Sequence, residues 1–383
     1  MVRLIFRNYI FTDKKLRKKY RKRFRFKRKR FRFYLLIFFY HICYMKDITL
    51  KQIAETLGIS ITTVSKALKD YPDVSSKTKK SVLELAQNLQ YTPNSFAVNL
   101  RTKESKTIGL IIPEVVHHFF SSVINGIIEE AEKSGYLVII LQSNESLTLE
   151  KKQVELLINK RVDGIIMSLS NESNDDEHIK EICKREIPFV LFDKISKFIN
   201  CSKVVIDDQK AAFNATEHLI LKGCKKIAHI RGPVNPQNAI DRFLGYKKAL
   251  EKHNIPFDYN LVYTCKNVTF EEGKEFAAAI LRDHPDVDGI FAITDLVAVG
   301  VLAHCNEQKI VVPDQIKVIG FSNWFMSQVI TPKLSTVDQP SYEMGVQSFT
   351  VLLEEMNCKK EMRPFNPKTI ELDTQIIGRD STL

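Results

Sequence analysis

From Thr107 onward, short runs of apolar residues alternate with longer segments whose apolar positions have helical spacing. The short runs have the length and β-branched composition of strands, and they read TIGLII, YLVIIL, GIIMSL, PFVLF, KVVI, KIAHI, GIFAI and IKVIGF. The helical segments between them are 119–134, 147–160, 208–222, 239–253, 269–283 and 295–308. Continuous apolar strands that alternate with helices are typical of parallel sheets buried on both faces.

Two blocks of this pattern, 107–205 and 206–337, predict two similar α/β lobes with a cleft between them. The segment LSTVDQP at 334–340 should then cross back to the first lobe. We assign roughly 338–360 to the first lobe and roughly 361–383 to the second. Because parallel sheets bind ligands beyond the carboxyl ends of their strands, side chains at the strand ends are candidates for a binding site.

The stretch 45–92 has a different pattern, which predicts three short helices. Thr49 and Ser60 are good N-caps, and Gly58 can take the left-handed conformation that ends a helix, so a tight turn should join the first two helices. The predicted inward positions are Leu50, Ile53, Ala54 and Leu57 in the first helix, Val64, Ala67 and Leu68 in the second, and Val82, Leu83, Leu85, Ala86 and Leu89 in the third. This is a helix-turn-helix arrangement, whose second helix lies in the major groove of DNA.

The outward-facing residues of the second helix have side chains suited to DNA. They are Ile61, Thr62, Thr63, Ser65 and Lys66. Hydroxyl groups donate to or accept from base edges and phosphates, and methyl groups pack against thymine. Helix capping alone also explains Ser and Thr at the start of a helix, so both interpretations stand for this motif taken by itself. Pro93 then breaks the chain, and the polar segment 93–106 leads to the first strand.

Basic residues are concentrated at the start of the chain. The chain has 57 Lys and Arg against 45 Asp and Glu, and residues 1–44 hold 16 of the basic residues and a single acid, Asp13. Residues 45–107 carry a net charge of +4 in a remainder that is slightly acidic. The stretch RKRFRFKRKRFRF could be an arm that binds nucleic acid or an anionic membrane, or part of a targeting segment. Because 1–44 has no helical or strand period, we expect a disordered or non-native extension, with the native start at Met45.

The residue patterns of catalysis and metal binding do not occur in the sequence. Seven scattered cysteines form no CxxC pair, which favours a reducing cytoplasm and argues against zinc and disulfides. The phosphate-binding glycine loops and the HExxH and GxSxG motifs are also missing. His117 and His118 are adjacent and have no third ligand at a suitable spacing. We therefore expect no metal, no cofactor and no enzymatic activity.

The stretches LKQIAETLGISITTVSKAL and VSSKTKKSVLELAQNLQYTPNSFAVNLRTKESKTIGLIIP resemble the DNA-binding domain, hinge and first core strand of the LacI/GalR family of bacterial transcription regulators. The resemblance extends from about Thr49 to Gly378. It implies a cytoplasmic homodimer that binds a pseudo-palindromic operator in double-stranded DNA, with a periplasmic-binding-protein-like core of two parallel-sheet lobes. It also implies DNA contacts at Leu50, Ser60, Ile61, Thr62, Thr63, Ser65, Lys66, Asn94, Ala97 and Leu100. Leu100 matches the leucine that wedges into the minor groove, whereas Val98 stands where many members have arginine.

The same resemblance implies an effector site in the cleft. The loop VVHHFF at 115–120 matches a family loop that usually reads Asn-Pro-Phe-Phe, so Phe119 and Phe120 would offer apolar faces to a ring. Arg242 matches the family's effector-binding arginine, and Asp295 matches the acidic residue of an Asn-Asp pair in which Thr294 here replaces the Asn. The further candidates are Asp207, Trp324 and Gln339. A salt bridge or a core contact is the competing interpretation at each position.

These features predict a ligand-responsive, DNA-binding transcription regulator, and a repressor in particular. Its effector would be a small molecule, such as a sugar or a related metabolite. One alternative is a solute-binding protein of a transport system, although such a protein needs an export signal and no helix-turn-helix. The other alternative is a regulator controlled by a protein co-regulator instead of a small ligand.

Overall fold

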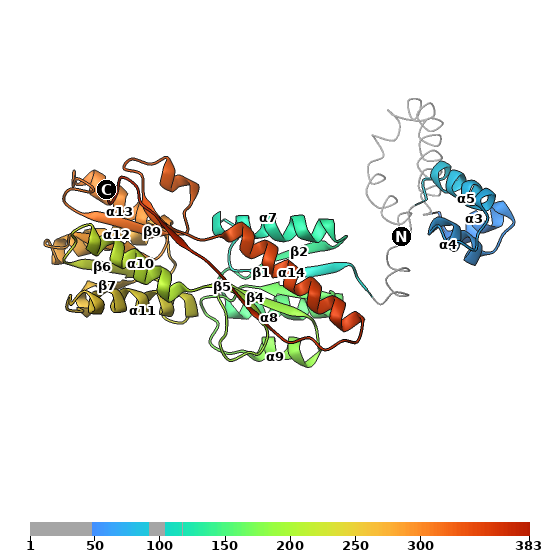
Figure 1. The fold of residues 1–383 in the computed structure, drawn as a ribbon, viewed down its shortest axis with the longest axis horizontal. Helices are drawn as coiled ribbons and strands as arrows, with labels where there is room; N and C mark the ends of the chain where they lie inside the picture. Colours follow the sequence, from blue (N-terminus) through green and yellow to red (C-terminus); the bar gives the residue numbers. More distant parts are fainter. Residues whose placement is uncertain (1–47, 92–103, 117) are drawn as a thin grey trace, which may run out of the picture. The chain divides into compact units, whose positions relative to one another are not determined.

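The structure, a computed structural model, describes residues 48–91, 104–116 and 118–383. The chain forms two compact units, 1–101 and 102–383 (Figure 1). Several residues singled out in the sequence lie outside the described ranges: the basic stretch 1–44, His117, and the hinge residues Asn94, Ala97 and Leu100. Among the described residues, no helix is long and apolar enough to cross a membrane.

The first unit contains the predicted helix-turn-helix. Its helices are α3 (Leu50–Leu57), α4 (Ile61–Leu68) and α5 (Ser76–Asn88). Thr49 and Gln52 form a capping box at the start of α3, and Gly58 ends the helix with a left-handed φ of 64°. Ser60 caps α4 by accepting a hydrogen bond from the backbone N–H of Thr63. The turn that we predicted between the first two helices is therefore confirmed.

Apolar side chains from all three helices close a small core. Ile53, Val64 and Val82 are completely buried in it, and Leu85 and Leu89 pack against it. The prediction for Leu83 was wrong, because this side chain is 52% exposed. The spacing placed Leu83 next to the buried stripe of α5, but the core of a three-helix unit is too narrow to cover it.

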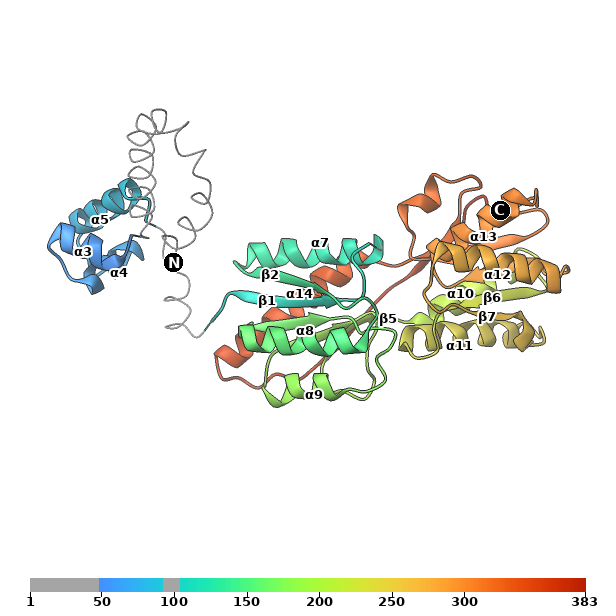
Figure 2. The same ribbon diagram turned by 180° about the vertical axis from the view of Figure 1, so that it is seen from behind.

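The second unit contains two six-stranded sheets (Figure 2). The first sheet has the order β11-β5-β4-β3-β1-β2, and all its pairs are parallel. Its strands are β1 (Thr107–Ile112), β2 (Leu137–Gln142), β3 (Gly164–Met167), β4 (Phe189–Phe192), β5 (Ser202–Ile206) and β11 (Thr369–Leu372). The second sheet has the order β12-β10-β9-β8-β6-β7, in which only the β10–β12 pair is antiparallel. Its strands are β6 (Ile227–Arg231), β7 (Val262–Thr264), β8 (Gly289–Ala292), β9 (Lys317–Phe321), β10 (Ser335–Asp338) and β12 (Gln375–Ile377).

Helices cover both faces of each sheet. In the first lobe, α7 (His118–Lys133) and α14 (Ser341–Lys360) pack on one face, and α8 (Leu147–Lys160) and α9 (Glu177–Lys184) pack on the other. In the second lobe, α10 (Asp208–Leu221) and α11 (Gln237–Lys252) lie opposite α12 (Phe270–Asp283) and α13 (Asp295–Glu307). Two short 3-10 turns complete the second lobe, η1 (Tyr259–Leu261) and η2 (Phe325–Gln328). The predicted α/β architecture of two parallel-sheet lobes is confirmed.

The chain passes between the lobes in three places. It crosses from β5 to α10, from β10 to α14, and from β11 to β12. The segment 334–340 does lead back to the first lobe, but most of it forms β10, a strand of the second sheet that we did not predict. The assignment of 361–383 to the second lobe was wrong for β11, which pairs with β5 in the first sheet. Short edge strands such as β7, β11 and β12 carry too few apolar residues to be recognised by pattern.

Candidate functional site

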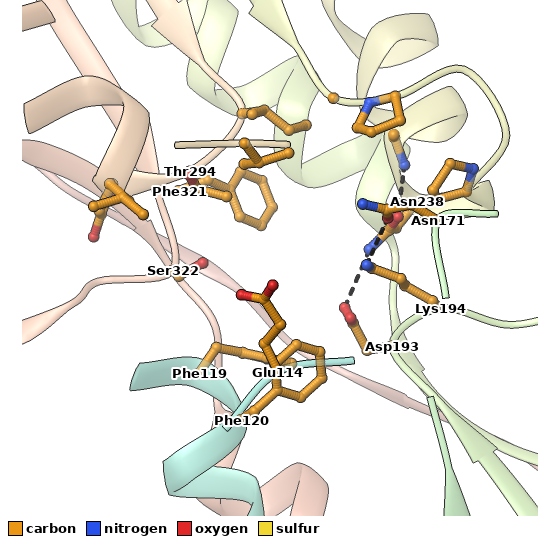
Figure 3. A pocket seen from close by; sticks show the side chains of 18 of the residues that line it. Glu114, Phe119, Phe120, Asn171, Asp193, Lys194, Asn238, Thr294, Phe321 and Ser322 are labelled. Atoms are coloured by element: carbon orange, nitrogen blue, oxygen red, sulfur yellow. Dashed lines mark hydrogen bonds between the residues drawn. The ribbon is translucent and has the colours of Figure 1, made fainter. Parts of the chain in front are cut away.

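A cavity of about 360 Å³ lies between the two lobes. The first lobe contributes Glu114, Phe119, Phe120, Asn171, Asp193 and Lys194 to its lining, and the second contributes Asn238, Arg242, Ile293, Thr294, Asp295 and Phe321. Figure 3 shows the carboxylate of Glu114 directed into the space between the lobes. Most of these residues stand at the end of β1, β3, β4, β8 or β9 or within the next four residues. The cavity therefore lies beyond the carboxyl ends of both parallel sheets, where ligands bind in folds of this class.

Arg242 on α11 is held rigidly at the wall of this cavity. Its Nε donates to Oδ1 of Asp208 across 2.7 Å, and its Nη1 donates to the carbonyl oxygen of Ile293 across 3.0 Å. The guanidinium carbon lies 3.7 Å from the ring centre of Phe321, a cation–π distance. Burial raises the pKa of Asp208, and the charge of Arg242 partly offsets that rise. The two bonds use two of the five N–H groups of the guanidinium, so the side chain is oriented and retains donors for a ligand.

Asp295, in the first turn of α13, is a buried residue of the second lobe that also lines the cavity. Its Oδ2 accepts from the backbone N–H of Trp324 and its Oδ1 accepts from the hydroxyl of Thr336, each across 2.6 Å. Burial raises the pKa of this carboxyl to about 6, and the hydrogen bond from Thr336 opposes the rise. A Cβ at position 320 would lie only 2.3 Å from Oδ1, so Gly320 is needed to admit the carboxylate.

Polar side chains join the two lobes at the edge of the cavity. Nδ2 of Asn238 donates to Oδ1 of Asp193 across 3.3 Å, and Asn235 donates to the carbonyl oxygen of Asn171 across 3.4 Å. An ion pair of 3.1 Å also links Lys197 of the first lobe to Asp241 of the second. Asp193 is buried, which raises the pKa of its carboxyl. These bonds favour the relative position of the lobes that the structure shows.

Lys194 and Gln339 are two further polar groups on the lining. The ammonium group of Lys194 donates to Glu145 and to the side chain of Asn171, each across 2.6 Å, so its charge is already balanced. Oε1 of Gln339 accepts from the hydroxyl of Ser322 across 2.8 Å. Its Nε2 is buried and has no hydrogen-bond partner. A buried donor without a partner is unfavourable, which makes this amide a candidate for contact with a bound molecule.

Aromatic side chains form the apolar part of the lining. Phe119 and Phe120 meet edge to face with ring centres 5.2 Å apart, and Phe120 packs deeper against Phe192. Trp324 lines the cavity and contacts Phe325 edge to face at 5.8 Å. Both rings line the cavity, and Phe119 is half-buried whereas Phe120 is buried.

Of the seven residues expected at the cleft, Phe119, Phe120, Arg242, Asp295, Trp324 and Gln339 line the cavity. Asp207 does not, because its carboxylate caps α10 by accepting from the backbone N–H of Lys210 across 2.9 Å. The next residue, Asp208, points the other way and binds Arg242. Sequence reasoning missed Glu114, Asn171, Asp193, Lys194 and Asn238. All except Asn238 stand one or two residues after a predicted strand, which is a signal that could have identified them.

The residues expected to contact DNA differ in how exposed they are. Ile61 and Thr62 at the start of α4 are exposed, as a base-reading surface requires. The hydroxyl of Thr63 lies 2.8 Å from that of Ser60, so both hydroxyls take part in capping. Lys66 pairs with Asp73, and Leu50 packs against the core. Ser65 is half-buried.

The two units match two family models. Residues 49–94 match the model for bacterial regulatory proteins of the lacI family. Residues 105–367 match the model for periplasmic binding proteins and the sugar binding domain of the LacI family. The chain belongs to the LacI family of bacterial regulatory proteins. The resemblance that the sequence suggested is therefore confirmed, and the helix-turn-helix match supports a regulator over a transport protein.

Several relatives match along nearly their whole length. The chain is 31% identical over 334 residues to the ribose operon repressor of Halalkalibacterium halodurans. The matched region covers 87% of this chain and 97% of that protein. The solved structure of transcription regulator CcpA of Lactococcus lactis is 30% identical with a TM-score of 0.66, covering 72% of this chain and 99% of that one. The solved structure of a LacI family transcriptional regulator from Enterococcus faecium with bound ribose is 27% identical with a TM-score of 0.62, covering 72% of this chain and 98% of that one.

Proposed function

We propose that this protein is a transcription regulator, a repressor, that binds an operator sequence through its helix-turn-helix and a small molecule in the cavity between its lobes. The observation that carries the proposal is the presence on one chain of a correctly capped α3–α4 pair and a two-lobed core whose cavity has polar groups from both lobes. The ribose operon repressor among its relatives supports the same role. The protein would act in the cytoplasm as a homodimer, and it would be a binding protein without catalytic activity.

The effector would be a sugar or a related metabolite. The volume of about 360 Å³ falls in the range of small-ligand pockets. Arg242 and the carboxylates of Asp193 and Asp295 can bind hydroxyl groups, and Phe119 or Trp324 can contact the apolar face of a ring. The ribose bound to the relative from Enterococcus faecium is a compound of this kind.

The DNA-reading surface would be the exposed start of α4, where Ile61 and Thr62 stand. A methyl group on either side chain can pack against thymine, and the Thr62 hydroxyl can bind a base edge. Ser60, Thr63, Ser65 and Lys66 would contribute phosphate contacts. Lys66 would exchange its partner Asp73 for a phosphate, which is favourable because this ion pair is exposed.

Selection of duplex DNA from a random library by the full chain tests the DNA-binding part of the proposal. We expect enrichment of a pseudo-palindromic sequence, with protection from cleavage in two symmetric half-sites. Ribose and other pentoses, hexoses and nucleosides would then be added to the complex, and a fitting compound should change the affinity for the selected duplex. Recovery of unrelated sequences only would contradict the DNA-binding role. A selected duplex whose affinity responds to none of these compounds would contradict the effector class.

A further inference from the structure

Residues 105 and 106, at the end of the polar segment 93–106, are hydrogen-bonded to the first lobe through one carboxylate, that of Asp163. Oδ1 of Asp163 accepts from the backbone N–H and the hydroxyl of Ser105, across 2.7 Å and 3.0 Å. Its Oδ2 accepts from the backbone N–H of Lys106 across 2.8 Å. In the opposite direction, the backbone N–H of Asp163 donates to the carbonyl oxygen of Thr107. One residue thus binds three consecutive positions at the start of β1.

The backbone at this point has an unusual conformation that needs such support. Lys106 has a positive φ of 50°, which is uncommon for a residue with a Cβ. Its ammonium group lies 4.3 Å from the ring centre of Tyr136 and 3.3 Å from Glu104, and Lys360 at the end of α14 pairs with the same Glu104 at 2.5 Å. The chain therefore enters the first sheet in a fixed direction, held by residues from three separate parts of the lobe.

The second lobe contains a related arrangement that serves as an internal comparison. Asp288 also stands between a buried Val and a Gly that begins a strand, and it also accepts two backbone hydrogen bonds. Its partners are the N–H groups of Lys225 and Lys226, at 2.7 Å and 2.9 Å, just before β6. This carboxylate stabilises the start of a strand in the same way. The chain enters β6 from α10 and the turn after it, whereas it enters β1 from the DNA-binding unit.

We propose that Asp163 is a positioning residue for DNA recognition, because it fixes the residues through which the core connects to the helix-turn-helix unit. The proposal rests on the proposed function. With Asp163 in place, 104–106 are already ordered before DNA is bound. Without it, ordering these residues opposes operator binding, and ordering one backbone residue weakens an equilibrium by roughly a factor of ten. Asp163 directly precedes β3, at the amino ends of the strands of the first sheet, whereas the cavity lies beyond their carboxyl ends, so effector binding should not depend on it.

The substitution Asp163→Asn tests this role, and Asp288→Asn is its matched control. In both variants an amide N–H group faces a backbone N–H group that previously donated to a carboxylate oxygen, so each loses hydrogen bonds of the same kind. We expect a similar decrease in Tm for the two variants. Affinity for the duplex that the unmodified chain selects from random DNA should fall about tenfold or more in D163N, as the ordering of one residue predicts. The affinity for this duplex should change less than about twofold in D288N, because the Asp288 carboxylate orders no residue of the segment 104–106.

Ser105→Ala provides a milder variant in case D163N does not fold. It removes the hydrogen bonds of the Ser105 hydroxyl to Asp163 and to the backbone of Thr107 and keeps the two backbone N–H groups that donate to Asp163, so its affinity should lie between those of the unmodified chain and D163N. Equal operator affinities in D288N and in D163N, or in S105A if D163N is unfolded, would overturn the inference and leave the proposed function intact. Failure of the unmodified chain to select any duplex would overturn the proposed function and the inference with it.

Discussion

Arg242 and Asp208 form an ion pair that is almost completely buried, with Nε of the guanidinium 2.7 Å from Oδ1 of the carboxylate. The pair places a cation at the wall of the cavity and keeps its own carboxylate outside the lining. Two buried charges separated from water must be paired and hydrogen-bonded to be tolerated. Asp208 therefore holds the Arg242 side chain in place. The guanidinium of Arg242 is available to any ligand that enters the cavity.

Arg242→Ala should leave operator affinity without effector nearly unchanged and abolish the response to the effector. Couplings of this kind change affinity by roughly five- to 150-fold, so the loss is easily measured in DNA titrations with and without the active compound. Arg282→Ala is the control, since this arginine is an exposed residue of the same lobe that pairs with Asp283. A variant at Arg242 that still responds at the ligand concentrations of the unmodified chain would exclude the cavity as the effector site.

The same variant should have a stability that depends on pH. Without Arg242, burial and the nearby carboxylates of Asp193 and Asp241 raise the pKa of the Asp208 carboxyl above the value of about 7 that it has beside the arginine. The folded chain then binds a proton that the unfolded chain releases, so the free energy of unfolding falls as pH rises. Urea unfolding should show a larger deficit relative to the unmodified chain at pH 8 than at pH 6. A deficit that is independent of pH would mean that Asp208 stays charged.

Asp295→Asn should reduce the pH dependence of stability and weaken the effector response. Burial raises the pKa of this carboxyl from 3.8 to about 6, so the folded chain binds one proton more than the unfolded chain between these values. Stability from this group is present at low pH and is lost as pH rises through about 6, by about 3 kcal/mol in total. The asparagine variant has no such proton. Unfolding curves at pH 4 and pH 7 should therefore differ less in the variant than in the unmodified chain.

Local signals made the helix-turn-helix predictable, whereas the cavity depends on tertiary structure. Thr49, Gly58 and Ser60 set the ends of helices through bonds to residues three or four positions away, so the sequence contains the whole interaction. Asp207 and Asp208 show where prediction from local sequence fails. Which carboxylate faces the cavity wall depends on where α10 begins, and a shift of one residue turns a side chain by about 100° around a helix.

The residues missed at the cavity have partners far away in the chain. Asp193 and Asn238 come from different lobes and meet only because both sheets end at the same place. Asp193 follows directly on β4, which is a usable signal, whereas nothing in the sequence distinguishes Asn238 from other polar residues at the start of a helix. The seven predicted positions, in contrast, included Arg242 and Asp295, whose neighbours resemble the family closely enough to be aligned. The resemblance to the family therefore predicted most of the site, and the residues that it omitted stand at strand ends, except Asn238 on α11.

Asn238→Ala should weaken effector binding more than Asn235→Ala. Both asparagines donate across the lobe interface, but Asn238 binds the buried carboxylate of Asp193 whereas Asn235 is exposed and its bond to the carbonyl of Asn171 is 3.4 Å long. Loss of a hydrogen bond to a buried charged group removes about 1.5–3 kcal/mol, and loss of a weak exposed one removes little. Calorimetric titration of both variants with the active compound measures the difference. Equal affinities would show that the Asn238–Asp193 bond does not contribute to the relative position of the lobes in which the effector binds.

A chain that starts at Met45 should keep the affinity and sequence preference of the full chain at physiological salt. The proposed base-reading residues all follow Met45, and the basic stretch 1–44 would add only a sequence-independent attraction to phosphates. That attraction weakens steeply as salt rises, so the two chains should differ most at low salt and converge as salt is added. Titrations of the selected duplex and of a scrambled duplex at two salt concentrations measure the sequence-specific affinity and the sequence-independent attraction separately. Loss of discrimination between these duplexes in the shorter chain would assign sequence recognition to the extension.

Ile61→Ala should change which base pairs the protein prefers without changing the stability of the fold. Ile61 is 47% exposed at the start of α4, so truncation removes little buried surface. Leu83 on α5 is 52% exposed in the same unit, and Leu83→Ala is therefore the matched control for the loss of an exposed aliphatic side chain. A base contact typically contributes about 1–3 kcal/mol of discrimination, so the selected duplex should bind to I61A with clearly lower affinity and to L83A with unchanged affinity. Repeating the DNA selection with I61A should give a different base at one symmetric pair of positions. If both variants select the original sequence with equal affinity, α4 does not read DNA through Ile61.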